Sequence, residues 1–317
     1  MNSRAIKFVV LLLSLLFLAA CSRDAEKPLR VGSNVWIGYE PVYLAREMGY
    51  FKGTDIHLIE LRSATQVMDS LRTGNLEVAM LTLDELLTVM QDGVSLSVIA
   101  IMDISHGADV LLVRPGVTLE TLRGKRIGVE NTALGAVVLE GALAKAGLTV
   151  EDIHIVPSRA DDHEALYRKG KVDAVVSFEP MRTRLMKMGA QQIFDSSEIP
   201  NQIIDVMVVR TDIGDQHHQQ LQKLIKSYFR GLDYLEKHPQ EAIRQMAPRM
   251  HISAEELQQA YTGVELPTLS MTRSWLDSDR LEKQAMFLED LMIRSHLLDQ
   301  RLQLKGLADP RYLPPGD

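Results

Sequence analysis

The feature of this sequence that most constrains its fold is an alternation of short apolar runs with longer amphipathic stretches. The alternation begins at Leu29, starts again near Val110, and gives way after Gly214 to helical periodicity alone. Short strands separated by helices imply right-handed βαβ units and mostly parallel sheets. The sequence therefore predicts an α/β protein with two α/β lobes, followed by C-terminal helices.

The individual elements follow from the period of the apolar residues. The predicted strands are Leu29–Ser33, Ile56–Leu61, Val78–Leu81, Leu96–Met102, Val110–Val113, Arg126–Glu130, Ile153–Val156, Ala174–Ser177 and Val206–Val209. The predicted helices are Pro41–Tyr50, Ala64–Arg72, Leu83–Gln91, Leu119–Arg123, Leu134–Ala146, His163–Arg168, Pro180–Met188, Leu221–Lys237, Gln240–Pro248, Ala254–Thr262 and Ser278–Gln303.

The N-terminal residues have the pattern of a secretion signal. Arg4 and Lys7 precede the 13-residue run Phe8–Ala20, which is apolar except for one serine. A transmembrane helix needs about 20 apolar residues, so this run suits a signal peptide better than a membrane span. It ends in Leu18-Ala19-Ala20-Cys21, which resembles the bacterial lipobox, where the cysteine is lipidated and becomes the new N-terminus.

Cleavage at this point would remove residues 1–20 as a signal peptide and leave residues 21–28 as a lipidated tether. Ser22 follows the cysteine where an aspartate would stand in the inner-membrane signal, which favours the outer membrane in a Gram-negative cell. The alternative is that Cys21 is a free cysteine after an uncleaved anchor. Because Cys21 is the only cysteine, it cannot form an internal disulfide.

The charge balance argues against nucleic acid as a partner. The chain has 35 basic and 42 acidic residues, which gives a formal net charge of −7. No basic run interleaved with aromatic residues is present to bind a phosphate backbone. With 317 residues, 46% of them hydrophobic, the chain is long enough for two domain cores.

Several short motifs in a fixed order resemble those of a known family. They are Leu29-Arg30-Val31-Gly32, Val35 to Pro41, Gly49-Tyr50-Phe51, Leu71 to Ala79, Leu122 to Val129 and Gly170 to Ala174. Together they resemble the periplasmic solute-binding proteins of nitrate/sulfonate/taurine-type ABC importers, a superfamily that includes thiamine-pyrimidine binders and synthases. The likeness covers nearly all of the chain after the tether, and is sharpest between residues 29 and 210.

The resemblance implies a type II periplasmic-binding-protein fold, in which two crossovers join two α/β lobes around a ligand cleft. We expect the crossovers near Asp103–Asp109 and Ile204–Met207. The first lobe then begins with residues 29–104 and the second lobe comprises residues 109–204. Residues 205–317 would contain the return crossover and the C-terminal helices that complete the first lobe, an assignment that depends on the resemblance alone.

Ligands of open α/β sheets bind at the carboxyl ends of the strands, and this rule selects candidate ligand-binding residues. They are Asn34, Trp36, Tyr39, Glu40, Ser63, Thr82, Asp84 and Ser105 in the first lobe, Glu130, Asn131, Thr132, Phe178 and Glu179 in the second lobe, and Asp205 at the return crossover. Three of these have a structural alternative: Trp36 as a packing residue, Ser63 as a helix N-cap, and Asp84 as a first-turn acid stabilised by the helix dipole.

Acidic residues outnumber cations at these strand ends. The acids are Glu40, Asp84, Asp103, Glu130, Glu179 and Asp205, and the cations are Arg62 and Arg159. A site for nitrate or a sulfonate would place cations or helix amides where these acids stand. With the rings of Trp36, Tyr39 and Phe178, the set favours an amine-bearing or heteroaromatic ligand. The alternative left open is that several of the acids face solvent.

The leading hypothesis is a non-enzymatic, monomeric, lipid-anchored receptor on the periplasmic side of the envelope, which presents a small polar solute to an ABC permease. One alternative, with the same clamp, is a ligand-sensing subunit of a membrane kinase or cyclase. The other is an enzyme like the thiamine-pyrimidine synthases. We expect no cofactor and no metal site, since His217 and His218 lack a third ligand at metal spacing.

Substitution of Cys21 tests the lipid anchor. Because Cys21→Ala removes the chain's only thiol, we expect an unlipidated or uncleaved precursor. Membrane fractionation and mass spectrometry of the N-terminus measure this, with the wild-type chain as the control. Unchanged fractionation and an unchanged N-terminal mass would contradict an anchor at this residue.

Overall fold

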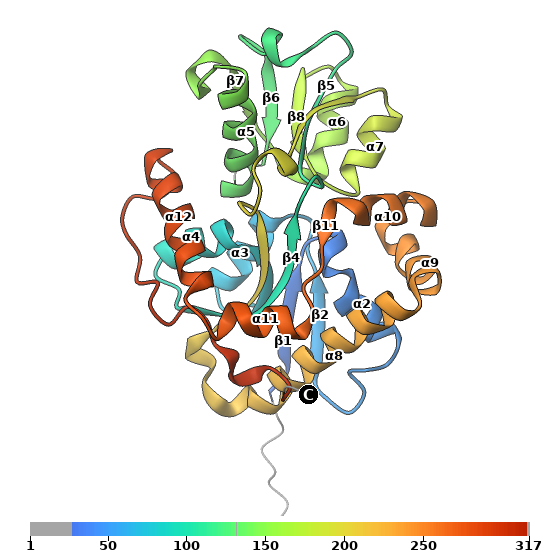
Figure 1. Ribbon diagram of the computed structural model, residues 1–317, viewed down its shortest axis with the longest axis vertical. Coiled ribbons are helices and arrows are strands. Elements are labelled where there is room, and N and C mark those ends of the chain that lie inside the picture. Colours follow the sequence, from blue (N-terminus) through green and yellow to red (C-terminus); the bar gives the residue numbers. More distant parts are fainter. Residues whose placement is uncertain (1–26, 131, 316–317) are drawn as a thin grey trace, which may run out of the picture.

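The computed structural model describes residues 27–130 and 132–315. These residues form two lobes, one above the other in Figure 1, each built on one β-sheet. The predicted signal peptide, Cys21, Ser22, most of the tether and Asn131 lie outside the described residues. Within the two described segments, no helix is long and apolar enough to cross a membrane.

The first sheet has six strands in the order β11-β4-β10-β3-β1-β2. In chain order they are β1 (Leu29–Ser33), β2 (Ile56–Glu60), β3 (Val78–Thr82), β4 (Leu96–Ser105), β10 (Ile204–Arg210) and β11 (Val264–Glu265). β1 pairs in parallel with β2 and β3, whereas β10 is antiparallel to β3 and β4. Every residue of β3 and β4 is buried, as expected for central strands covered on both faces.

Helices from both halves of the chain cover the first sheet (Figure 1). They are α2 (Glu40–Glu47), α3 (Ala64–Arg72), α4 (Leu83–Gln91), α8 (His218–Lys237), α9 (Pro239–Met250), α10 (Ala254–Ala260), α11 (Leu269–Leu276) and α12 (Arg280–Arg294). The Tyr228 hydroxyl in α8 donates to the Met102 carbonyl at 2.9 Å. The Thr272 hydroxyl in α11 donates to the Ile101 carbonyl at 3.3 Å. The C-terminal helices are thus bonded directly to β4.

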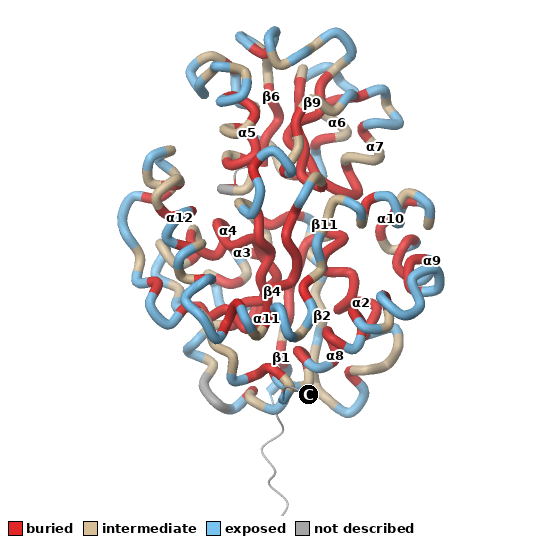
Figure 2. Tube along the Cα trace, viewed as in Figure 1, coloured by how far each residue is buried: buried red, intermediate tan, exposed pale blue. Residues whose placement is uncertain are grey.

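The second sheet has five strands in the order β7-β6-β8-β5-β9. Its elements are β5 (Val110–Val113), β6 (Arg126–Val129), α5 (Ala133–Lys145), β7 (His154–Pro157), α6 (His163–Arg168), β8 (Ala174–Ser177), α7 (Met181–Lys187) and β9 (Gln191–Asp195). Alternate residues of β5 face opposite sides. Leu111 and Val113 belong to a core within this lobe, while Val110 and Leu112 join the larger core shared with the first lobe. Figure 2 shows the buried strands of both sheets in red.

Two connections join the sheets. The first runs from the end of β4 at Ser105 to Val110, and the second from Asp195 to Ile204. The Ser105 and Ser196 hydroxyls are hydrogen-bonded at 2.7 Å, and the Gly107 N–H donates to the Ser196 hydroxyl at 2.7 Å. The two connections are therefore tied to each other at the point where the chain leaves the first lobe.

Several elements differ from the sequence prediction. The expected crossover Ile204–Met207 lies inside β10, where all four residues are buried, because its apolar run continues as a central strand. Strands β9 and β11 and helix α11 were not expected, since β9 begins with two glutamines and β11 has two residues. The helix expected over residues 278–303 ends at Arg294, because His296 has a left-handed backbone (φ 56°).

Close packing of α8 on α2 gives a stability prediction. A Cβ added at Gly231 would lie 2.3 Å from the Pro41 carbonyl oxygen. On a free helix surface, alanine would stabilise by about 0.8–1.0 kcal/mol over glycine. Here we expect Gly231→Ala to lower the free energy of unfolding by about 1–3 kcal/mol, because the two helices must separate.

Urea denaturation measures this change. Lys226→Ala, at an exposed position of α8, is the control and should stay within about 0.5 kcal/mol of wild type. A Gly231→Ala protein more stable than wild type would show that the contact between α8 and α2 is looser than described.

Candidate functional site

A small cavity lies between the lobes, where the carboxyl ends of the strands converge. We call it the acidic chamber, and it is lined by Asn34, Trp36, Tyr39, Ala64, Thr82, Glu85, Asp109, Leu134, Phe178 and Asp205. Its volume is about 20 Å³, which is room for about one water molecule. Because Phe178 and Leu134 come from the second lobe, the two lobes are closed on each other in this structure.

Aromatic residues at the acidic chamber link the lobes and hold its acids. The rings of Trp36 and Phe178 meet edge to face across the lobes, with centroids 5.7 Å apart and an interplanar angle of 88°. The Trp36 indole N–H donates to Asp103 Oδ2 at 3.1 Å. The Tyr39 hydroxyl donates to Asp205. Both aromatic residues therefore use their polar end to fix a buried carboxyl group.

The carboxyl groups at this site are buried without a cation. They are Asp84, Glu85, Asp103, Asp109 and Asp205, each at most 3% exposed. None of them has an ion-pair partner in residues 27–130 and 132–315. One oxygen each of Asp84, Glu85, Asp103 and Asp109 also lacks a hydrogen-bond partner there. Such groups are stable when they hold a proton or a ligand donor.

Burial raises the pKa of all five groups. The pKa reaches about 7 for Asp103 and Asp109 and about 6 for Asp84. The pKa of Glu85 and of Asp205 lies well above the usual range, because burial is reinforced by neighbouring carboxylates. At neutral pH several of these acids therefore keep their protons in the closed form.

A second link between the lobes runs from Thr65 to Glu130. The Thr65 hydroxyl donates to Glu130 Oε1 at 3.0 Å. Burial raises the pKa of Glu130, and hydrogen bonds from Thr65 oppose the shift. Thr65 lies in the first turn of α3, whose N-cap Ser63 accepts a hydrogen bond from the Gln66 N–H. Ser63 thus positions a helix start that touches the other lobe.

The structure brings six of the sequence-selected residues together at the acidic chamber: Asn34, Trp36, Tyr39, Thr82, Phe178 and Asp205. Others serve the surrounding framework. Ser105 bonds the two connections, Thr132 caps α5, and Glu179 binds Arg182 and Thr183 in α7. Glu40 is buried beside Arg249, at 2.9 Å.

Two acids of the chamber were not selected from the sequence. Glu85 closes a capping box with Thr82 at the start of α4, and its Oε2 accepts the Thr82 N–H at 3.1 Å. That spacing, Thr-x-x-Glu, is visible in the sequence. Asp109 lies at the end of the first connection and inside the segment Asp103–Asp109 where the sequence analysis expected a crossover, so a search of that segment would have found it.

Beside the acidic chamber lies a second cavity of about 250 Å³, which we call the outer chamber. It is lined by Asn34, Val35, Glu60, Leu61, Arg62, Ala160, Asp161, Glu164, Phe178, Pro180, Met181, Arg184, Arg249 and His251. Asn34 and Phe178 line both chambers. The two cavities therefore adjoin at these two residues.

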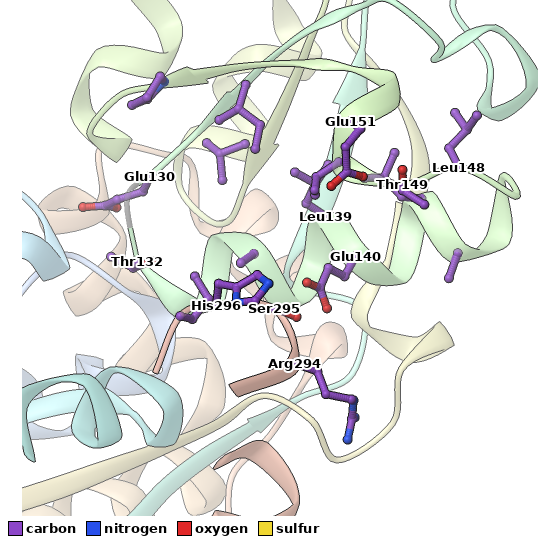
Figure 3. A pocket seen from close by; sticks show the side chains of 18 residues that line it. Glu130, Thr132, Leu139, Glu140, Leu148, Thr149, Glu151, Arg294, Ser295 and His296 are labelled. Carbon is purple, nitrogen blue, oxygen red and sulfur yellow. The ribbon is translucent and has the colours of Figure 1, made fainter. Parts of the chain in front are cut away.

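A third cavity, of about 550 Å³, lies between α5 and the segment that follows α12 (Figure 3). Glu140 and His296 both line it (Figure 3), and much of its wall is aliphatic, as at Leu139. It shares no lining residue with the acidic chamber. In the part of the chain that the structure describes, no group of His, Cys, Asp and Glu is arranged to hold a metal ion.

Comparison of the sequence with known protein families gives one match. A sequence profile described as the NMT1-like family matches residues 23–251. No curated protein sequence matches the chain.

Solved structures resemble the chain over nearly its whole length. The alkanesulfonate-binding protein SsuA from Xanthomonas axonopodis pv. citri, bound to MOPS, is 18% identical with a TM-score of 0.75, over 90% of this chain and 99% of that one. The periplasmic aliphatic sulphonate binding protein SsuA from Escherichia coli is 15% identical with a TM-score of 0.73, over 92% and 95%. The desulfurization enzyme DSZB is 18% identical with a TM-score of 0.67, over 90% and 97%. These likenesses confirm the predicted fold class.

The buried acids make stability depend on pH. The folded protein holds protons on Asp103 and Asp109 up to about pH 7, whereas the unfolded chain releases them near pH 4. The free energy of unfolding should therefore fall as the pH rises from about 4 to 7. Burial lowers the pKa of His163 from 6.5 to about 4. Between these two pH values His163 makes the free energy of unfolding rise with pH, which opposes the effect of the aspartates.

Variants isolate the contribution of the acids. Between pH 4 and 7 the free energy of unfolding should fall less steeply in Asp103→Asn and in Asp109→Asn than in the wild type. Each substitution removes the contribution of about one proton to that slope. Urea unfolding at several pH values measures the slope, and Glu289→Gln, a buried acid paired with Arg301, is the control. An Asn variant with the wild-type slope would contradict the raised pKa of that aspartate.

Proposed function

The chain belongs to the NMT1-like family, and on that premise we propose that it is a solute-binding protein that delivers its ligand to an ABC permease. The observation that carries the proposal is the acidic chamber, whose walls come from both lobes and where one oxygen each of Glu85 and Asp109 lacks a hydrogen-bond partner among the described residues. A ligand that bonds these oxygens and also contacts Phe178 and Leu134 of the second lobe favours the closed state, because the open state lacks the second-lobe contacts. Its likeness to the two sulfonate-binding proteins supports this role.

The proposed ligand carries N–H donors rather than a sulfonate. A sulfonate would meet carboxyl groups in the acidic chamber, and repulsion or proton uptake would oppose its binding. An ammonium group or an aminated heteroaromatic ring would donate to Asp109 and Asp205 and lie beside the Trp36 ring. The ligand class proposed here therefore differs from that in the relatives' names.

We propose a binding role without catalysis. DSZB, named as a desulfurization enzyme, shows that the fold also carries enzymes. Cys21, the chain's only cysteine, belongs to the proposed lipid anchor, which leaves no cysteine nucleophile in the rest of the chain.

The proposed location is the periplasmic side of the envelope, with the lipid on Cys21 as the anchor. Because the carboxyl end of β1 leads into the acidic chamber, Leu29 at its amino end lies at the far end of the first lobe. A tether that leads into this end leaves the cleft and both lobes free to meet a permease. Outer-membrane sorting through Ser22 and a monomeric state are part of the same proposal.

The ligand class is tested by thermal shift and calorimetry. We expect protonated amines or aminopyrimidines to raise the melting temperature, since a ligand at 100 times its Kd stabilises by about 2.7 kcal/mol. Nitrate and methanesulfonate should leave it unchanged. Trp36→Ala should weaken the best ligand about tenfold, through the lost cation–π contact, and Asp205→Asn about 10- to 100-fold.

Glu289→Gln is the matched control, because Glu289 is also a buried acid but binds Arg301 outside the cleft. It should bind the ligand as wild type does. Wild-type affinity in both folded cleft variants would disprove the cleft assignment. Tighter binding of nitrate or a sulfonate than of any amine would disprove the ligand class and leave the binding role intact.

A further inference from the structure

The acidic chamber is too small for a whole organic ligand. Its volume of about 20 Å³ accommodates one water-sized group, such as an ammonium. Asn34 and Phe178 line both this chamber and the adjoining outer chamber, which has about 250 Å³. A ligand with its head in the acidic chamber must therefore place the rest of its atoms in the outer chamber. The chemistry of that chamber then selects the other end of the ligand.

Arginines from three separate elements line the outer chamber. Arg62 follows β2, Arg184 lies in α7 and Arg249 lies in α9. Within the described segments Arg62 is exposed and forms no ion pair, while Arg184 pairs with Glu164 at 3.1 Å. This concentration of guanidinium groups contrasts with the acidic chamber, where no cation is present among the lining residues.

Arg249 is the most enclosed of the three, with a side chain 16% exposed. Its guanidinium lies over the Tyr43 ring, 3.4 Å from the centroid. Its Nη1 is 2.9 Å from Glu40 and 3.0 Å from Glu60. None of its three nitrogens, however, forms a hydrogen bond of acceptable geometry within the described residues. Its N–H groups thus face two acids at ion-pair distance, without a hydrogen bond of good geometry to either within the described residues.

The acids that face the outer chamber are each matched by an arginine. Glu60 pairs with Arg249, Asp161 with Arg159 at 3.0 Å, and Glu164 with Arg184. Glu40 is fully buried behind Arg249, and burial raises its pKa to about 8, which favours its neutral form. Three arginines and three acids thus line the outer chamber, and Arg62 is the lining arginine that forms no ion pair within the described residues.

We infer that the ligand is bipolar, with an ammonium or N–H-rich head in the acidic chamber and a carboxylate or phosphate group bound by Arg249 and Arg62 in the outer chamber. This inference rests on the proposed function and adds to it the second end of the ligand. Arg249 then determines specificity, because a guanidinium with unused N–H groups binds oxyanions with charge-assisted hydrogen bonds.

Probes that share a four-carbon chain test this directly on the full-length protein. Calorimetry compares butylamine, 1,4-diaminobutane, 4-aminobutanoate and 4-aminobutyl phosphate. We expect at least one of the two anion-bearing amines to bind about 10- to 100-fold more tightly than butylamine, and the diamine to show no such gain. A larger gain for 4-aminobutanoate indicates a carboxylate ligand, and a larger gain for 4-aminobutyl phosphate indicates a phosphate ligand.

Arginine variants locate the anion. Arg249→Met and Arg62→Gln should each remove most of the gain of the anion-bearing amine and leave butylamine within about twofold. Arg123→Gln, at an arginine 65% exposed and paired with Asp152 in the second lobe, is the control. If Arg249→Met does not fold, the Arg62→Gln variant and the comparison of the four probes on the wild type still test whether the outer chamber binds the anionic group.

Two results would overturn the inference. Equal binding of all the amines, or a gain that survives in both arginine variants, would disprove the bipolar ligand while leaving the amine site in place. Binding of none of the four amines would disprove the proposed amine site together with this inference.

Discussion

The closed cleft depends on burying carboxyl groups that have no ion-pair partner among the described residues. Asp103 and Asp205 are held by the polar ends of Trp36 and Tyr39, while Asp109 comes from the connection between the sheets. Taking an unpaired carboxylate out of water costs several kcal/mol, so closure requires protons or a donor-bearing ligand. The same groups that make an empty closed state costly are the ones that would recognise the ligand.

The chain passes between the two sheets at the two connections. The Ser105 and Ser196 hydroxyls join the connections, and beyond them the lobes share apolar packing, including the Trp36–Phe178 contact, and several polar links. One is the Thr65–Glu130 hydrogen bond, and another is the ion pair of Lys187 with Glu256 at 2.6 Å, where the lysine is 60% exposed. Exposed ion pairs contribute about 0–1 kcal/mol. The exposed polar links therefore add little to closure, and differential contact with a ligand shifts the population of the closed form.

The sequence predicted the architecture because its strongest signals are local. The alternation from Leu29 and the restart at Val110 are periodic patterns that survive without knowledge of tertiary contacts. The rule that ligands bind at strand ends found Trp36, Tyr39 and Asp205, which meet at one cavity. It could not rank the acids, because Glu179 and Asp205 follow the same rule. Only the fold shows that Glu179 binds Arg182 while Asp205 lines the chamber.

The ligand is set by a few side chains that the fold itself does not require. A type II cleft supplies strand ends and helix starts, and these positions accept an anion or a cation according to the residues placed there. Here Glu85 completes a helix cap, so one carboxyl group both stabilises α4 and makes the chamber acidic. An anion-binding relative could keep the cap with glutamine, which also completes the box. The acid at this position therefore cannot be explained by capping alone, and its unpaired Oε1 is the part that a ligand would use.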